Sequence, residues 1–296
     1  MKWEGDRQSD NVEDRRGGGG GGGGFGGLGG KSVGIGTLVI ALIGGAIFGV
    51  DPGTIIDVMG GGVGGTVPVQ QGQAPGPQSA PINDRETQFV KTTLAYTEDV
   101  WATIFKEQGA QYQPTRLVLF EGATPTACGT GRSATGPFYC PPDRKVYIDL
   151  SFFRLMQQRF QVEGEFAQAY VIAHEVGHHV QNLLGVSDQV HKAQQRASEK
   201  EGNALSVRLE LQADCFAGVW ANRTNQREQI LEKGDVETAL AAATAIGDDA
   251  LQRQSQGQVV PDSFTHGSSA QRVRWFTRGL ESGKVEQCNT FDARQL

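Results

Sequence analysis

The chain has 296 residues, of which 38% are apolar, and its 27 basic and 33 acidic side chains give a formal net charge of −6. That apolar fraction is enough for one sizeable core, but 42 glycines are too many for a single compact domain and indicate unstructured segments. The negative charge, with no basic cluster beside aromatic side chains, argues against a nucleic-acid partner.

The composition of residues 1–32 predicts a disordered tail. Residues 1–16 are highly charged with both signs, and the stretch 17–30 is glycine apart from Phe25 and Leu28. A segment of this kind buries too little apolar surface to offset the entropy of ordering its backbone. We therefore expect the whole of this tail to be flexible.

Residues 33–50 form an uncharged, mostly apolar run of 18 residues, which predicts one transmembrane helix. As a helix the run reaches about 27 Å, just enough for a thin hydrocarbon core. Arg15, Arg16 and Lys31 precede it and Asp51 follows, so we expect the N-terminus in the cytoplasm and the rest of the chain outside. A cleaved signal peptide is the alternative, although its apolar run would normally be shorter.

The stretch 51–82 is rich in Gly, Pro and Gln and is typical of a linker, so we expect the folded domain to span residues 83–296. Asn83 and Glu86 form a possible capping box for its first helix. Apolar patterning predicts strands at 117–120 and 145–150, and helices at 151–161, 165–184, 188–223, 235–254 and 268–281. The predicted fold class is α+β, mostly helical with a small sheet.

A short motif, His-Glu-Val-Gly-His at residues 174–178, lies within one of these predicted helices. Because positions four apart on a helix share a face, His174 and His178 present two imidazoles to one point. Glu175 lies between them in sequence and can act as a base. The pattern is typical of zinc hydrolases, in which two histidines bind the ion and the glutamate activates water.

The next helical stretch offers two carboxylates on one face. Glu210 and Asp214 lie four residues apart among apolar neighbours. Two inward carboxylates would be costly without a cation, so we expect Glu210 to be the third zinc ligand. We expect Asp214 to accept the outward N–H of a ligating histidine. A surface helix with a charged stripe is the alternative.

Other histidines fit the metal site less well. A metzincin would need glycine and histidine where the chain has Gln181 and Leu184, so that ligand scheme is excluded. His179 points about a quarter turn away from the motif face, and we expect it to be structural or solvent-facing. His191 lies in a polar run and is expected to be exposed.

A polar loop before the last predicted helix contains His266, and Arg272 follows on that helix. Amide hydrolysis builds negative charge on the former carbonyl oxygen, and a second donor beside zinc lowers that barrier. His266 and Arg272 are our candidates outside the zinc helices. The alternative is a helix cap, with Ser268 or Ser269 capping and the histidine incidental.

Four cysteines follow the predicted membrane helix. The expected topology places them in an oxidising compartment, where cysteines pair. Four cysteines allow three pairings. We favour Cys128–Cys140 and Cys215–Cys288, because the other pairings force long loops to cross. A cysteine zinc site is disfavoured, since no close Cys-x-x-Cys spacing is present.

The chain resembles a bacterial family of neutral zinc metallopeptidases, which are small membrane-anchored gluzincins. The resemblance rests on segments 11–17, 136–141, 146–150, 174–181, 210–218 and 264–268. It implies a zincin-like fold, Zn²⁺ as cofactor with His174, His178 and Glu210 as its ligands, and Glu175 as the catalytic base. It also implies a single-pass anchor in the bacterial inner membrane, with the catalytic domain periplasmic or extracellular.

The spacing Glu210-x-x-Ala-Asp214 is also similar to that of a wider group of membrane peptidases. In that group a later histidine and arginine lie near the zinc site. The similarity therefore implies that His266 acts in catalysis and that Arg272 supports the site from outside the ligand shell.

The expected function is a zinc-dependent peptidase, of endopeptidase type, that cleaves envelope proteins or peptides. Glu175 would take a proton from zinc-activated water and return it to the leaving amine. Alternatives are a zinc-stabilised adaptor or latent protease that acts by binding, and an amidase acting on cell-wall material. Substrate is expected along a sheet edge, for which 146–150 is a candidate, with an interior strand as the alternative.

Overall fold

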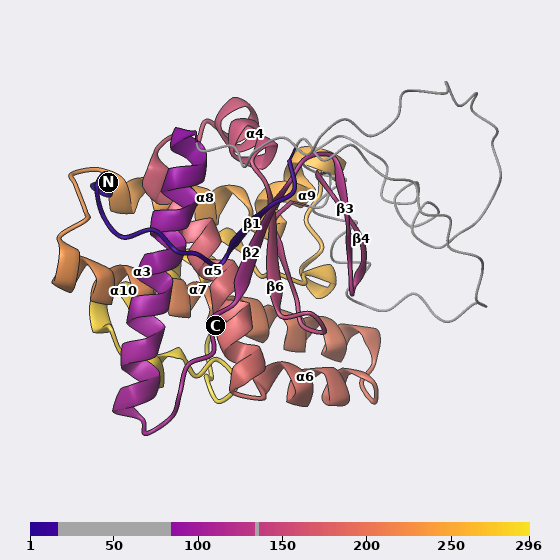
Figure 1. Cartoon of the computed structure of the whole chain (residues 1–296). Helices are drawn as coiled ribbons and strands as arrows, with labels where there is room; N and C mark the ends of the chain where they lie inside the picture. The colour runs from indigo at the N-terminus through magenta and orange to yellow at the C-terminus, as the bar shows by residue number, and fades with distance from the viewer. Residues whose placement is uncertain (17–83, 134–135) are drawn as a thin grey trace, which may run out of the picture.

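The computed structural model describes residues 1–16, 84–133 and 136–296 (Figure 1). The predicted membrane helix at 33–50 and the linker at 51–82 lie outside the described residues, as does the glycine-rich part of the tail. None of the helices within the described ranges is long and apolar enough to cross a membrane. The described part of the chain is α+β and mostly helical, as predicted.

A four-stranded sheet has the order β1-β2-β6-β5. The strands β1 (Val12–Asp14), β2 (Arg116–Phe120) and β6 (Lys145–Asp149) are parallel, while β5 (Phe138–Cys140) pairs with β6 in the antiparallel sense. The two predicted strands are therefore present. The suggestion that 146–150 forms the sheet edge is wrong, because β6 lies between β2 and β5. The edge strands are β1 and β5, each of three residues and too short to predict.

The disorder predicted for residues 1–32 is wrong for residues 1–16, which pack on the domain beside α3 (Arg85–Glu107) (Figure 1). Trp3 is buried, and its ring contacts Phe89 edge-on at a centroid distance of 5.5 Å. Trp3 Nε1 also donates to Glu165 Oε2 at 2.8 Å. Composition misled the prediction, because one tryptophan and a three-residue strand are enough to dock this charged segment.

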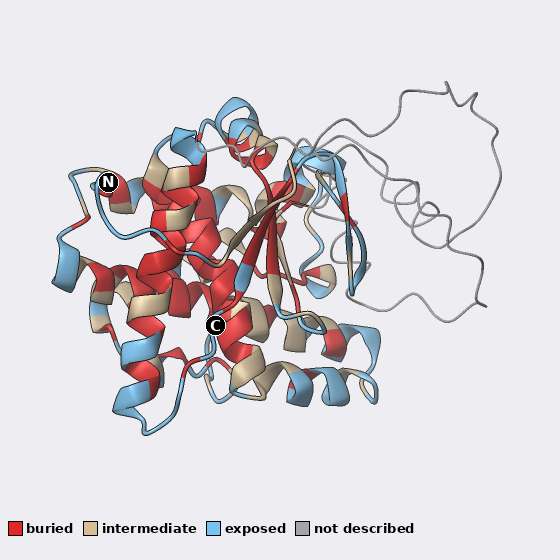
Figure 2. Ribbon diagram, viewed as in Figure 1, coloured by how far each residue is buried: buried red, intermediate tan, exposed pale blue. Residues whose placement is uncertain are grey.

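The helices form a layer against one face of the sheet, and the zinc-motif helix α5 (Glu165–Leu183) lies at its centre. α5 contacts α3, α7 (Glu199–Glu228) and α8 (Asp235–Ala245), as well as strands β5 and β6. α10 (Ser269–Ser282) packs closely on α7. Buried residues follow these contacts through the middle of the molecule (Figure 2). α4 (Ser151–Phe160) connects β6 to this layer.

Two predicted helices are each divided in the structure. The stretch 188–223 forms α6 (Val186–Gln194) and α7, because Ser198 begins a new helix with a capping box to Glu201. The stretch 235–254 forms α8 and α9 (Asp248–Gln256), with Gly247 between them. The first helix of the domain is capped by Asp84, which accepts from the backbone N–H of Thr87. Short 3₁₀ turns, η2 (Pro261–Ser263) and η3 (Val285–Cys288), complete the C-terminal part.

Both predicted disulfides are present. Cys128–Cys140 ties the hairpin of β3 (Ala123–Thr126) and β4 (Gly129–Arg132) to the edge strand β5. Cys215–Cys288 ties η3 near the C-terminus to α7. Each bridge therefore fixes a segment beside an element of the candidate site.

Candidate metal centre

The three predicted metal ligands come from α5 and α7 and meet at one point. His174 and His178 lie one turn apart on α5, with ring centroids 4.8 Å from each other. Glu210 on α7 places Oε2 3.2 Å from His174 Nε2, and Oε1 3.5 Å from His178 Nε2. The three ligand atoms lie within 4.8 Å of one another. Two imidazoles and one carboxylate are a known ligand set of catalytic zinc, which leaves a position for water.

Gly177, inside the motif, sets how closely α5 and α7 approach. A Cβ atom at Gly177 would lie 3.1 Å from the carbonyl oxygen of Ala213 and 3.2 Å from its Cα. A side chain there would be closer to the α7 backbone than an ordinary contact, so the two helices would have to separate slightly. The glycine is thus part of the geometry that brings the ligands together.

The electrostatics of the ligand set favour a bound cation. Burial raises the pKa of the Glu210 carboxyl, but His178 and His174 beside it hold that pKa well below its ordinary value. Burial lowers the pKa of His174, while Asp214 and Glu210 more than offset this and raise it to about 10. Without metal the site therefore retains protons, and a divalent cation would balance the same buried carboxylates.

Asp214 lies where the sequence predicted it, behind the first histidine. Its Oδ1 accepts from His174 Nδ1 at 2.8 Å and from the Tyr170 hydroxyl at 2.6 Å. The Arg272 guanidinium donates to both oxygens, with Nε 2.8 Å from Oδ2 and Nη2 2.9 Å from Oδ1. The carboxylate is fully buried and Arg272 nearly so. Arg272 is therefore engaged with Asp214, which fixes the acceptor that orients His174.

Glu175 faces the same cleft as the ligands and is buried. Burial raises the pKa of its carboxyl above the ordinary value, and the nearby His174 and His178 reduce that rise. A carboxylate with a raised pKa beside the ion position is suited to accept a proton from water and release it again. The structure thus places the predicted base next to the predicted ligands.

His266 also lines the cleft, and Asp248 holds it there. Asp248 Oδ1 lies 3.0 Å from His266 Nδ1, and Oδ2 accepts from the backbone N–H groups of Thr265, His266 and Gly267 at 2.7, 2.6 and 3.0 Å. Ser268 caps α10, as the alternative predicted, and His266 lines the cleft as well. Asp248 was not predicted, because helix α9 and the loop after it separate this residue from His266, and its local pattern indicates only a helix start.

The remaining histidines lie outside the ligand set. His179 is buried. Its Nδ1 lies 3.0 Å from the Tyr139 hydroxyl, and its Nε2 lies 2.6 Å from the Gln113 carbonyl oxygen. It is structural, as one of the two expectations had it. His191 is exposed, as expected, and lies on α6 at the side of the cleft over the ligands.

The cleft over the ligands has a volume of about 530 Å³. One wall is the edge strand β5 with its flanking prolines, another is α6, and the loop holding His266 closes a third side. Apolar side chains line it beside the charged centre, among them Phe138, Phe152, Val171, Ile246 and Leu251.

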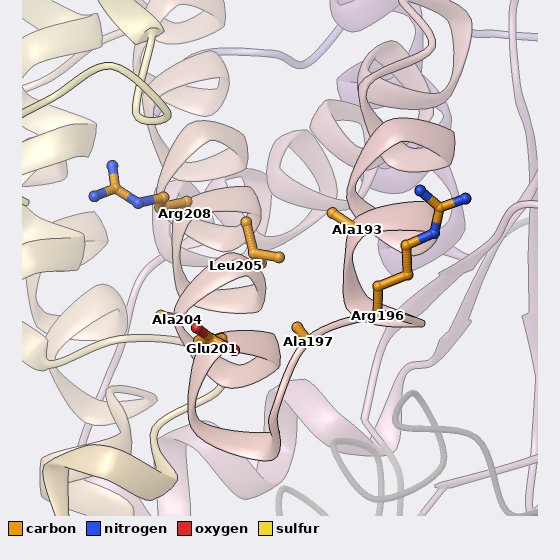
Figure 3. Close-up of a pocket in the computed structure, with 7 residues that line it drawn as sticks. All are labelled: Ala193, Arg196, Ala197, Glu201, Ala204, Leu205 and Arg208. Atoms are coloured by element: carbon orange, nitrogen blue, oxygen red, sulfur yellow. The ribbon is translucent and has the colours of Figure 1, made fainter.

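A second hollow, between α6 and α7, carries no comparable chemistry. It has a volume of about 430 Å³ and an alanine-rich floor, with Arg196 and Arg208 at opposite ends (Figure 3). Glu201 there belongs to the capping box of α7, and the Arg208 guanidinium binds the Thr290 carbonyl. These polar groups are used by the fold, so the cleft over His174 is the candidate site.

Comparison with known proteins shows the family of this chain. The family described as "Putative neutral zinc metallopeptidase" matches residues 1–291. The chain is 52% identical to the uncharacterized protein YpfJ of Escherichia coli K12, over 98% of this chain and 99% of that protein. It is 43% identical to the uncharacterized protein Rv2575 of Mycobacterium tuberculosis, over 70% and 73% of the two chains. No solved structure matches. The chain belongs to the neutral zinc metallopeptidase family.

Proposed function

We propose that this protein is a zinc-dependent endopeptidase of the gluzincin type, with a zincin-like catalytic domain. The observation that supports this is the convergence of His174, His178 and Glu210, with Glu175 beside them in the same cleft. When bound, zinc would supply a Lewis acid that polarises the scissile carbonyl and acidifies a water. The residues of the chain would provide the proton transfers, the alignment of the substrate and the exclusion of solvent.

The roles of these residues follow from their positions. Glu175 takes the proton of the attacking water and delivers it to the leaving amine. His266, held by Asp248, donates to the carbonyl oxygen as negative charge develops on it. The exposed edge of β5 offers backbone hydrogen bonds to an extended peptide, which tolerate many side chains. Arg272 takes no direct part, because Asp214 engages it.

Substitution of the base tests the proposal. Glu175→Gln in the full chain should retain one zinc and lose cleavage of casein or of a peptide library, because the amide cannot accept the proton. Zinc content and cleavage are measured on the same preparation, with and without a chelator. Cleavage by a pure Glu175→Gln preparation would refute the base. Zinc bound by the wild type without cleavage of any peptide would favour the adaptor function instead.

We also propose that the enzyme acts on proteins or peptides of the bacterial envelope. Two disulfides support this location, since bridges persist in oxidising compartments. The candidate anchor at 33–50 lies outside the described residues. Comparison of envelope proteomes from cells with wild-type and Glu175→Gln protein would identify substrates as species that accumulate in the variant.

A further inference from the structure

The outer nitrogen of His178 is held by a chain of two glutamine side chains. His178 Nδ1 lies 2.8 Å from Gln181 Oε1. Gln181 Nε2 donates to the Leu209 carbonyl oxygen at 2.7 Å and to Gln212 Oε1 at 3.1 Å. Gln212 Nε2 donates in turn to the carbonyl oxygen of Cys288 at 3.1 Å. Four hydrogen bonds thus connect a predicted zinc ligand to backbone carbonyls of two other segments.

The backbone carbonyl groups of Leu209 and Cys288 determine which group donates in each hydrogen bond of this network. A carbonyl can only accept, so Cys288 binds the amide nitrogen of Gln212 and turns Gln212 Oε1 toward Gln181. Gln181 then meets two acceptors, which fixes its amide nitrogen there and its oxygen toward His178. An oxygen facing Nδ1 places a proton on that nitrogen, so Nε2, which lies 3.5 Å from Glu210 Oε1, is the nitrogen left to bind a metal ion.

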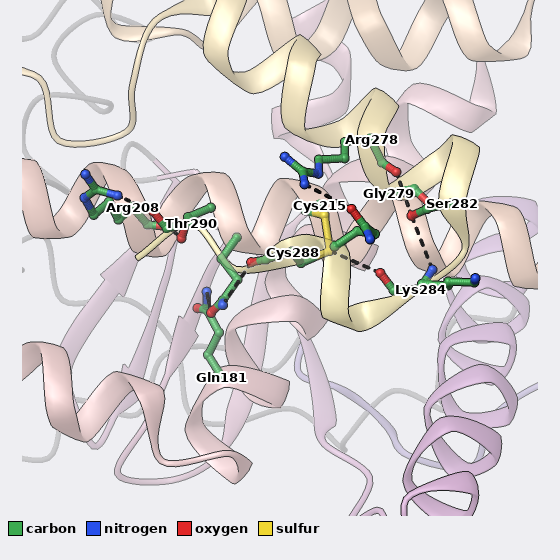
Figure 4. Close-up of a disulfide and its surroundings, with 11 residues drawn as sticks. Gln181, Arg208, Cys215, Arg278, Gly279, Ser282, Lys284, Cys288 and Thr290 are labelled. Carbon is green, nitrogen blue, oxygen red and sulfur yellow. Dashed lines mark hydrogen bonds between the residues drawn. A yellow bond between two sulfur atoms is a disulfide. The ribbon is translucent and has the colours of Figure 1, made fainter. Parts of the chain in front are cut away.

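This hydrogen-bond network is buried, and a disulfide fixes its far end. Gln181 and Cys288 are fully buried, and Gln212 is nearly so. Cys215 lies one turn after Gln212 on α7, and its bond to Cys288 keeps the accepting carbonyl beside the glutamine (Figure 4). Thr290 lies two residues after Cys288, and its Oγ1 donates to the Arg208 carbonyl oxygen on α7 at 2.6 Å. The far end of the chain is therefore held in place by covalent and polar contacts.

We propose that Gln181 and Gln212 are positioning residues that hold His178 in the tautomer and orientation needed for metal binding. This rests on the proposed zinc site. The two histidines would then be supported differently, His174 by the buried ion pair of Asp214 and His178 by neutral amides. Outer partners of this kind orient metal ligands, and their loss typically weakens metal binding.

The test measures zinc affinity by competition with a chromophoric chelator, and the absorption spectrum of the cobalt-substituted protein. Gln181→Met removes the acceptor at His178 and should raise the zinc Kd about 10- to 100-fold. Gln212→Met touches no ligand and should still raise it, by about tenfold. Because Gln212 acts only through Gln181, the double variant should match Gln181→Met alone. The cobalt spectrum should change in all three variants.

A matched control tests whether the loss of any two glutamine hydrogen bonds would weaken zinc binding. Gln252 donates to Ser263 Oγ and accepts from the Val260 N–H, away from the ligands. Gln252→Met should leave both the zinc Kd and the cobalt spectrum unchanged. An unchanged Kd in Gln212→Met, or independent factors that multiply in the double variant, would overturn the proposal.

The wild type is measured first, so that the two proposals fail separately. If the wild type binds no zinc, the proposed function fails; if it binds zinc and the glutamine variants bind equally well, only the positioning role fails. Should Gln212→Met not fold, Gln212→Ala removes the same acceptor toward Gln181 and the same donor to Cys288, with a small side chain that is favoured in a helix. It should raise the zinc Kd in the same direction, and an unchanged Kd would overturn the proposal.

Discussion

At the scale of single residues, the carboxylates of Glu210, Asp214 and Asp248 differ in the group that stabilises each of them. Glu210 faces the two histidines, Asp214 faces Arg272, and Asp248 faces His266 together with three backbone N–H groups. An unpaired buried carboxylate would be costly, so each local structure depends on its partner. The cleft thus combines negative groups that are ionised for different reasons.

The Asp248–His266 pair makes a prediction about stability and pH. Burial raises the pKa of Asp248, but His266 lowers it below 3.8; burial lowers the pKa of His266, but Asp248 raises it above 6.5. The pair therefore stabilises the fold fully between pH 3.8 and 6.5, and less as Asp248 protonates below or as His266 loses its proton above. Asp248→Asn should cost about 3–5 kcal/mol in that window.

Urea unfolding of the metal-free protein at several pH values measures this cost. The difference between wild type and Asp248→Asn should shrink on both sides of the window. Asp262→Asn is the control, because Asp262 and its partner Lys200 are exposed and such a pair contributes about 0–1 kcal/mol. A difference that stays constant with pH would contradict the assignment of charge to this pair.

At the scale of elements, a contact between glycines brings α10 against α7. A Cβ at Gly279 would lie 2.0 Å from the Cys215 carbonyl oxygen, and one at Gly218 would lie 2.1 Å from the Phe276 carbonyl oxygen. The two backbones therefore touch with no side chain between them. This approach carries Arg272 on α10 to Asp214 on α7, so the helix crossing supports the metal site.

Gly279→Ala should separate the two helices. Alanine is favoured over glycine within a helix by about 1 kcal/mol, but the clash with a backbone carbonyl cannot be relieved by a rotamer change. We expect a net loss of about 3 kcal/mol in the free energy of unfolding, measured in urea. Ser282→Ala on the same helix should change it by less than about 0.5 kcal/mol. Equal stability of Gly279→Ala and wild type would contradict the tight crossing.

Whether a site residue could be predicted from the sequence depends on how far apart it and its partners lie in the sequence. Residues 174–178 and the pair Glu210 and Asp214 were predictable, because a spacing of four on a helix is a local property. Asp248 and Gln212 were missed, since their partners lie on other elements, and aspartate at a helix start or glutamine within a helix has commoner uses. The division of 188–223 into two helices was missed because residues that favour helix, such as Ala, Gln, Lys and Glu, stand on both sides of the Ser198 cap.

At the scale of the whole molecule, residues 1–16 complete the domain that residues 84–296 begin. Strand β1 covers β2, and Arg7 binds Glu98 and Asp99 on α3. Arg16 binds Asp14 and the Thr87 hydroxyl, which ties the end of this segment to the start of α3. Its charges thus serve specific ion pairs that composition alone could not assign.

Trp3→Ala measures what this segment contributes. The loss of a buried tryptophan should lower the free energy of unfolding of the full chain by about 3–5 kcal/mol. Trp3→Phe should cost less, because it retains the ring contact with Phe89 and loses only the bond to Glu165. Urea unfolding compares the three proteins. No loss in Trp3→Ala would support a flexible tail instead.

The docked strand β1 also constrains the topology of the chain relative to a bilayer. Val12 pairs with Leu117 and Asp14 with Leu119, so these residues must share one aqueous compartment. One passage through a bilayer between residues 16 and 84 would set them on opposite sides and break the pairing. The expected arrangement, with the N-terminus cytoplasmic and the catalytic domain outside, therefore conflicts with this sheet. Residues 1–16 and the sheet that they join therefore lie on the same side of any bilayer.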